Sequence, residues 1–181
     1  MTKTISISRR QFAVAAASVA AVNAFPVHAA GREKEKTIQG DNMTKLTPYL
    51  LFDGSCADAM KFYQSCLGGN LTLTRVKDTP AKEQMSAAQQ EKILNAHLSA
   101  GEMELSASDW LAPNETPIRG NTVCMFVNGG TQAELTHLFE KLSEGAKVTN
   151  PLRPTYFGVY GALNDRFGVR WMFAGDFVPS K

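Results

Sequence analysis

The chain has 181 residues, of which 44% are hydrophobic and 20% charged, a balance typical of one globular domain with its own core and not of a disordered or fibrous chain. The formal net charge is +2, but Lys3, Arg9 and Arg10 lie in a first stretch of thirty residues that holds no acid. Without these three bases, 16 bases face 17 acids, so the charge gives no indication of nucleic-acid binding.

The first thirty residues have the pattern of an export signal. Residues 8–12 (SRRQF) precede an Ala/Val-rich run at 13–22 that is too short to span a bilayer, and residues 27–30 (VHAA) supply small residues for cleavage. This resembles a twin-arginine signal and predicts a periplasmic or secreted protein without a stable membrane anchor after cleavage. A first helix of the domain and a true membrane anchor are the alternatives; Pro26 and the mild hydrophobicity disfavour both.

A polar segment follows the signal. Residues 31–45 contain GREKEK and show no apolar period, which predicts a flexible linker between the signal and a domain at 46–177. Met43 is an alternative start, which would give a cytoplasmic form of the protein.

Two capped helices indicate an internal repeat. The first is predicted from Ser55, with a capping-box-like start that includes Asp58, to Gly68, and the second from Thr131, with a full capping box, to Gly145. Their starts lie 76 residues apart and their ends 77. The apolar faces consist of Ala59, Phe62, Tyr63 and Cys66 in the first helix and Leu135, Leu138, Phe139 and Leu142 in the second.

One β-patterned run precedes each helix and three follow it. The predicted fold class is therefore α+β, with two βαβββ repeats forming a curved mixed sheet, helices on the outer face and a concave inner surface for a ligand. Residues 77–91 interrupt the first half and are expected to form a lid or surface excursion. Strands are expected at 46–52, 70–76, 92–100, 103–108, 121–127, 147–149, 156–163 and 169–174.

The alternation of apolar and polar side chains predicts the register of one hairpin. A two-residue type II′ turn at Gly101-Glu102 pairs Ala100 with Met103, so that the apolar residues pack on the helix. The polar residues then pair as Ser99 with Glu104, His97 with Ser106, and Asn95 with Ser108.

The three cysteines are expected to be free, buried thiols. Cys56 and Cys66 lie at opposite ends of one predicted helix, about 15 Å apart at 1.5 Å per residue, which is too far for a disulfide. Cys124 is the third cysteine, and a chain that is exported already folded forms its core in the reducing cytosol, which favours free thiols.

Four segments, 48–69, 94–109, 138–152 and 156–173, together resemble the vicinal oxygen chelate superfamily, which has the glyoxalase and bleomycin-resistance fold. The resemblance is closer to its PhnB-like branch, because the D-x-F-G-V-x-W-M run at 165–172 is fairly specific. Members often have Trp where this chain has Phe157, a conservative change. The resemblance also implies a homodimer.

Metal-using members of that superfamily place a His or Glu in each cup from the first and last strand of each repeat. Aligned strand by strand, these positions fall at about Pro48, Ser106, Thr122 and Met172. None carries the imidazole, carboxylate or thiolate that Zn²⁺ or Fe²⁺ requires, so we expect neither a metal nor another cofactor.

The best inward polar pair is His97 with Glu104, either as a general acid and base or as part of a metal site. The alternative is a hydrogen-bonded histidine with no catalytic role. Trp110, Tyr156, Phe157 and Tyr160 form either an aromatic wall around a ligand or ordinary core and dimer-interface contacts. The predicted ligand pocket consists of Asn95, His97, Ser99, Glu104, Ser106, Trp110, Thr122, Cys124, Tyr156, Tyr160 and Met172.

The leading hypothesis is a protein that binds, sequesters or confers resistance to a small molecule. A lyase, isomerase or dioxygenase that uses His97 and Glu104 is the second hypothesis, and a structural domain with a collapsed cup is the third. The PhnB-like branch often carries a methyltransferase label. However, a doubly wound methyltransferase needs a glycine-rich loop for S-adenosylmethionine, and this chain contains no G-x-G.

Overall fold

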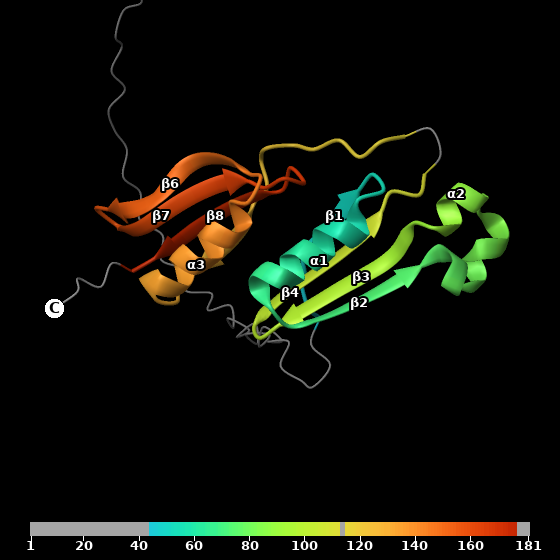
Figure 1. Ribbon diagram of the computed structural model, residues 1–181, viewed down its shortest axis with the longest axis horizontal. Helices are drawn as coiled ribbons and strands as arrows, with labels where there is room; N and C mark the ends of the chain where they lie inside the picture. Colours follow the sequence, from blue (N-terminus) through green and yellow to red (C-terminus); the bar gives the residue numbers. More distant parts are fainter. Residues whose placement is uncertain (1–43, 113–114, 177–181) are drawn as a thin grey trace, which may run out of the picture. The chain divides into compact units, whose positions relative to one another are not determined.

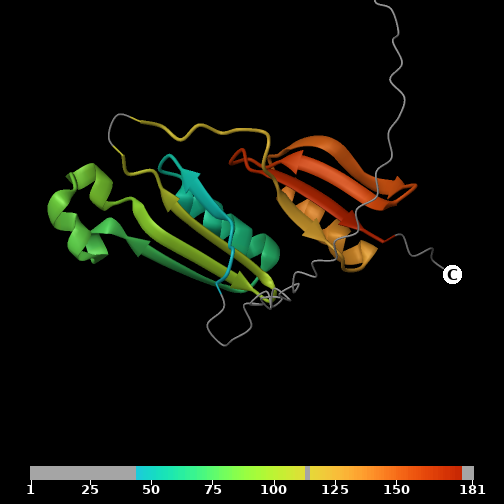
Figure 2. The same cartoon turned by 180° about the vertical axis from the view of Figure 1, so that it is seen from behind.

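The computed structural model describes residues 44–112 and 115–176, which form two βαβββ repeats (Figures 1 and 2). The predicted export signal, the linker up to Met43 and the alternative start at Met43 lie outside the described residues. Within the described residues, no helix has both the length and the hydrophobicity needed to cross a bilayer.

The first repeat consists of β1 (Tyr49–Phe52), α1 (Cys56–Leu67), β2 (Asn70–Arg75), β3 (Ile93–Ala100) and β4 (Met103–Asp109). Its strands lie in the order β1-β4-β3-β2; β1 and β4 are parallel and the other pairs antiparallel. Helix α1 covers one face of this sheet, as the two opposite views show (Figures 1 and 2).

The second repeat has the same order of elements. It consists of β5 (Met125–Asn128), α3 (Gln132–Leu142), β6 (Lys147–Thr155), β7 (Gly158–Asn164) and β8 (Arg170–Gly175), with strands in the order β5-β8-β7-β6. The predicted α+β class with two βαβββ repeats is confirmed. Each repeat builds its own four-stranded mixed sheet, and within the described residues no strand pairing joins the two.

The segment after β2 is an excursion from the sheet, as the sequence predicts, and it is built of short helices. It contains the short helices η1 (Val76–Asp78), η2 (Pro80–Gln84) and α2 (Ala87–Gln90) before the chain returns as β3 (Figure 1). The ends of the excursion are tied by Lys77, whose Nζ lies 2.9 Å from Oε2 of Glu91.

Three strand boundaries differ from the sequence prediction by three residues or more. Strand β6 extends to Thr155, well beyond the expected end at 149. It contains Pro151 and Pro154, which argue against a strand, but an edge strand tolerates proline because one of its sides needs no partner. The register also shifts twice along β6.

Strands β1 and β5 begin later than predicted, so Pro48 and Cys124 precede them.

The register of the β3–β4 hairpin is confirmed for the three pairs Ala100–Met103, Ser99–Glu104 and His97–Ser106. Gly101 adopts φ +63°, the left-handed conformation that the tight turn requires. Most apolar side chains of the hairpin are buried on the side of α1, as expected: Ala96, Leu98, Ala100, Leu105 and Ala107. Leu94 is only half-buried and Met103 is exposed, contrary to the expectation.

The core is one continuous cluster with members from both repeats. Ala59, Phe62, Tyr63 and Cys66 of α1 and Leu135, Phe139 and Leu142 of α3 are all buried, and Leu138 packs partly against them. Trp171 and Phe173 of β8 are buried on the helix-facing side, as alternation predicts. Complete burial of such side chains stabilises the fold by about 1.5–3 kcal/mol each.

The start of α1 is not capped as the sequence suggests. Ser55 makes no side-chain capping bond, because its backbone (φ −103°, ψ 9°) lies outside the extended region in which an N-cap side chain reaches the first turn. Instead, Oδ1 of Asp109 accepts from Cys56 N at 3.0 Å, and Oδ2 accepts from Ile93 N at 2.8 Å. The capping box of Thr131 and Glu134 on α3 is confirmed.

Candidate functional site

The predicted cross-strand pair of His97 and Ser106 lies on the sheet face opposite α1. His97 and Ser106 are half-buried there, with His97 Nδ1 3.3 Å from Ser106 Oγ. In the register of β1 and β4, Ser106 lies beside Tyr49. The histidine is therefore oriented by a hydroxyl group, within reach of solvent.

Glu104 lies in the same hairpin and forms an ion pair with Lys45. The hydrogen bond from Lys45 is the main cause that lowers the pKa of this carboxyl, and the charge of His97 lowers it further. Glu104 is therefore an ionised hydrogen-bond acceptor at neutral pH and is engaged by a lysine from the segment before β1.

The corresponding face of the second repeat carries two sulfur atoms in contact. Cys124 Sγ lies 3.2 Å from Met172 Sδ, and Phe126 lies beside Met172 in the register of β5 and β8. Met172 thus lies opposite the helix-packing side of Trp171 and Phe173, as predicted. Thr122 is exposed and precedes β5.

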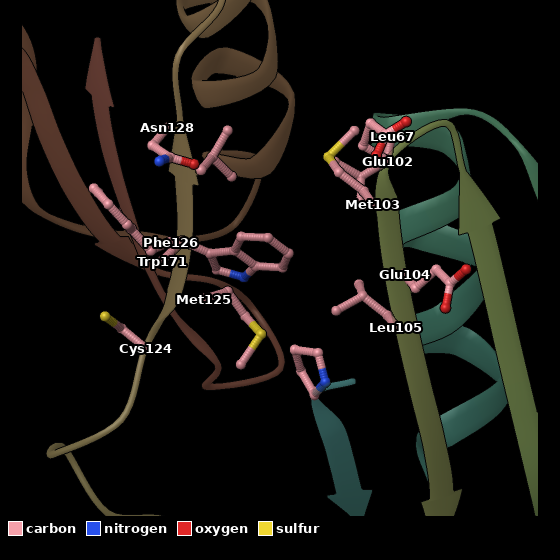
Figure 3. Close-up of a pocket in the computed structure, with 12 residues that line it drawn as sticks. Leu67, Glu102, Met103, Glu104, Leu105, Cys124, Met125, Phe126, Asn128 and Trp171 are labelled. Carbon is pink, nitrogen blue, oxygen red and sulfur yellow. The ribbon is translucent and has the colours of Figure 1, made fainter. Parts of the chain in front are cut away.

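A cavity of about 380 Å³ lies between β4 and β5 (Figure 3). Strand β1 begins only at Tyr49, opposite Ser106, so the first three residues of β4 have no β1 neighbour. The side chains around this gap come from both repeats and are mainly apolar. The lining residues are Pro48, Leu67, Glu102, Met103, Glu104, Leu105, Cys124, Met125, Phe126, Val127, Asn128 and Trp171.

The structure does not gather the predicted pocket residues in one place. Glu104 and Cys124 line the cavity between the repeats, and Trp110 lines a second cavity beside β1. Met172 does not line this cavity itself, but it lies beside two residues that do, Cys124 and Phe126. The others line neither of these two cavities: Asn95, His97, Ser99, Ser106, Thr122, Tyr156 and Tyr160.

The aromatic residues of the β6–β7 hairpin form a separate exposed cluster. Tyr156 is 99% exposed and its ring stacks edge-on against Phe157, with centroids 4.9 Å apart; Phe157 contacts Tyr160 in turn. These rings therefore do not form a wall with Trp110, which belongs to the other repeat.

Sequence reasoning missed the apolar lining of the cavity between the repeats. Alternation assigns Leu105, Met125 and Trp171 to the helix-facing core, and they do pack there. They also border the cavity, because the short β1 leaves the edge of β4 uncovered. Pro48 is the sequence signal that could have indicated where β1 begins, because proline is commonly found at the start of a strand.

The positions that hold metal in other members do not fit a divalent metal here. The register places the aromatic Tyr49, not Pro48, beside Ser106, and Phe126, not Thr122, beside Met172. Neither set offers the imidazole and carboxylate ligands of Zn²⁺ or Fe²⁺. Across residues 44–112 and 115–176, no three His, Cys, Asp or Glu side chains form a metal-binding group.

All three thiols are free, as expected, but they differ in environment. Burial, aided by the charge of Asp109, raises the pKa of Cys56 to about 12, and burial also raises the pKa of Cys66. Both are therefore neutral and unreactive at physiological pH. Cys124 is only half-buried.

The fold is that of the glyoxalase and bleomycin-resistance class of proteins. The chain is similar to a glyoxylase/bleomycin resistance protein/dioxygenase domain from Frankia sp. EAN1pec, with 15% identity, a TM-score of 0.51, and coverage of 76% of this chain and 96% of that one. It is also similar to a PhnB protein from Bacillus cereus, with 23% identity, a TM-score of 0.59, and coverage of 73% and 99%.

A closer similarity is found to protein PA1353 from Pseudomonas aeruginosa, with 34% identity, a TM-score of 0.66, and coverage of 74% of this chain and 98% of that one. The model of the 3-demethylubiquinone-9 3-methyltransferase family matches residues 44–174. This chain belongs to that family, and the PhnB-like resemblance of its sequence is confirmed.

Proposed function

We propose that this protein binds a small, largely apolar molecule in the cavity between its repeats. The observation that supports this is the cavity itself: its volume of about 380 Å³ lies in the range of small-molecule sites, and both repeats contribute side chains to it. Binding, sequestration or resistance is the function class that suits such a cavity in a glyoxalase-like fold.

One of the two carboxylates that line the cavity, Glu104, already has a cationic partner. Lys45 already neutralises Glu104, so the ligand does not need a cationic group to balance that carboxylate. Met103, Leu105 and Met125 offer an apolar surface that adapts to the shape of a ligand, because methionine side chains are flexible.

The test is mass spectrometry of small molecules that co-purify with the mature protein. Met103→Trp fills the cavity at a residue that is already 37% exposed, and Val148→Trp on β6 is the matched control at a similar exposure. We expect at least a tenfold lower ratio of ligand to protein in Met103→Trp only. Equal ligand content in the two variants would exclude this cavity as the site.

The contact of His97 with Ser106 supports a second candidate, an enzyme of the same superfamily. In this enzyme His97 would be the catalytic base and Glu104 a metal ligand. Elemental analysis of the purified protein separates the two candidates. A stoichiometric divalent metal that is lost in His97→Ala and kept in Ser99→Ala would favour the enzyme.

Methyl transfer is not part of this proposal. Both sheets are largely antiparallel, whereas the doubly wound methyltransferase fold needs a parallel sheet with a glycine-rich loop, and the chain has no G-x-G. The family name therefore does not by itself give the reaction.

We also propose export by the twin-arginine route and a homodimer, the first from residues 8–30 and the second from the family resemblance. Residues 1–35 fused to a folded reporter should deliver it across the inner membrane. Replacing Arg9 and Arg10 with lysine should stop that delivery, and unchanged export would refute the route. Light scattering of the mature protein gives the oligomeric state.

A further inference from the structure

Trp110 carries an unusual buried donor. Within the described residues, its indole Nε1 is the one buried side-chain nitrogen or oxygen without a hydrogen-bond partner. Nearly all such groups in folded proteins are paired, so an unpaired one needs an explanation. The other tryptophan, Trp171, shows the usual arrangement, with Nε1 2.8 Å from Oδ2 of Asp165.

The position of Trp110 is fixed by the end of the first sheet. Its backbone N–H donates to the carbonyl of Phe52 at 2.6 Å, and its carbonyl accepts from Lys92 Nζ at 3.0 Å. The preceding residue, Asp109, is itself held by two backbone N–H groups. The backbone at Trp110 is thus anchored from both sides, and the unpaired N–H is not the result of a loose chain.

Trp110 lines a cavity of about 450 Å³ beside β1. Tyr49 and Leu51, on the sheet face opposite the buried Phe52, contribute apolar surface and are 53% and 38% exposed. Residues 115–119 form the remaining wall. The cavity therefore combines the apolar surface of β1 with a tryptophan whose buried N–H has no partner, and Glu115, Thr116 and Arg119 add polar groups on the opposite wall.

The wall at 115–119 is not part of a sheet or helix. Its last residue, Arg119, places its guanidinium over the ring of Phe52, 5.2 Å from the ring centroid. An outward shift of this wall would break no strand pairing, and a bound molecule needs such a shift to reach the buried indole N–H.

We propose that this second cavity binds a small apolar molecule with one hydrogen-bond acceptor oxygen, such as a ketone, and that the oxygen accepts from Trp110 Nε1. No residue of this cavity lines the cavity between the repeats, so the site is independent of the function proposed above. Either proposal can therefore be refuted without the other.

The experiment compares acetophenone with ethylbenzene, which has nearly the same shape and no acceptor. In ¹H–¹⁵N spectra of the full chain, the two indole signals are assigned with Trp110→Phe. We expect acetophenone to move the Trp110 signal downfield while the Trp171 signal stays in place, and ethylbenzene to bind at least tenfold more weakly.

Two variants test the proposed hydrogen bond and the proposed apolar surface separately. Trp110→Phe should abolish the preference for acetophenone, and Leu51→Ala should weaken the binding of both probes several-fold. Met103→Trp, in the other cavity, should change neither. Equal affinities of the wild type for the two probes, an unchanged preference in Trp110→Phe, or no binding of either probe would overturn the proposal.

Discussion

The hydroxyl of Tyr63 donates a 2.7 Å hydrogen bond to Oδ2 of Asp165, a residue 102 positions further along the chain. Trp171 Nε1 donates to the same oxygen, and Oδ1 accepts from the backbone N–H groups of Phe167 and Val169. Asp165 is buried in the turn between β7 and β8. One carboxylate therefore shapes this turn and joins helix α1 to the second repeat.

The four donors to Asp165 predict unequal costs for two substitutions. Tyr63→Phe removes one donor and should lower the free energy of unfolding by about 1–2 kcal/mol. Asp165→Ala leaves several buried donors unpaired and should cost about 3–5 kcal/mol. Urea denaturation measures both, with the fully exposed Tyr156→Phe as control. Equal costs for Tyr63→Phe and Asp165→Ala would contradict the shared-carboxylate arrangement.

The starts of the two helices should respond differently to removal of their capping residues. Ser55→Ala should change the free energy of unfolding by less than about 0.5 kcal/mol, because Ser55 makes no capping bond. Thr131→Ala should cost about 1 kcal/mol. Asp109→Ala should cost about 2–4 kcal/mol, since two buried N–H groups lose their acceptor. Chemical denaturation ranks the three variants by their free energy of unfolding. A large loss of stability in Ser55→Ala would show that Ser55 does cap α1.

The raised pKa of Cys56 predicts a loss of stability in alkali. Between pH 9 and 12 an unfolded chain loses this thiol proton while the folded protein keeps it, so the free energy of unfolding falls as pH rises. This group contributes at most about 1.4 kcal/mol per pH unit. Denaturation of the wild type and Cys56→Ala at pH 8–11 should show a shallower decline in the variant. Parallel declines would mean that the thiol ionises in the folded state.

Thiol labelling should separate Cys124 from the two buried cysteines. Under native conditions a disulfide reagent should modify one thiol rapidly, because Cys124 is half-buried whereas Cys56 and Cys66 are covered by the core. Cys124→Ser should abolish the rapid phase, and urea should expose the remaining two thiols. Rapid labelling that persists in Cys124→Ser would show that the core opens.

The features that the sequence predicts well depend on neighbours close along the chain. Helix bounds follow from apolar spacing and from Gly68, and the β3–β4 register follows from alternation and Gly101. Met172 also lies on the sheet face that the alternation of side chains along β8 predicts.

The features that the sequence does not reveal depend on distant residues. The sequence around Asp109 and Asp165 does not indicate that their carboxylates accept hydrogen bonds from residues up to 102 positions away. The lining of the cavity between the repeats depends on where β1 begins relative to β4. The length of β6 follows from its place at a sheet edge, where Pro151 and Pro154 are tolerated.

The different caps of the two helices bear on the order in which the chain assembles during synthesis. Helix α3 finds its cap within four residues, so its first turn is complete as soon as Glu134 has emerged. Helix α1 receives its cap from Asp109, 53 residues after Cys56, so its first turn must wait until the strand that carries Asp109 has left the ribosome. Helix α1 therefore emerges well before its cap, whereas α3 emerges together with its own cap.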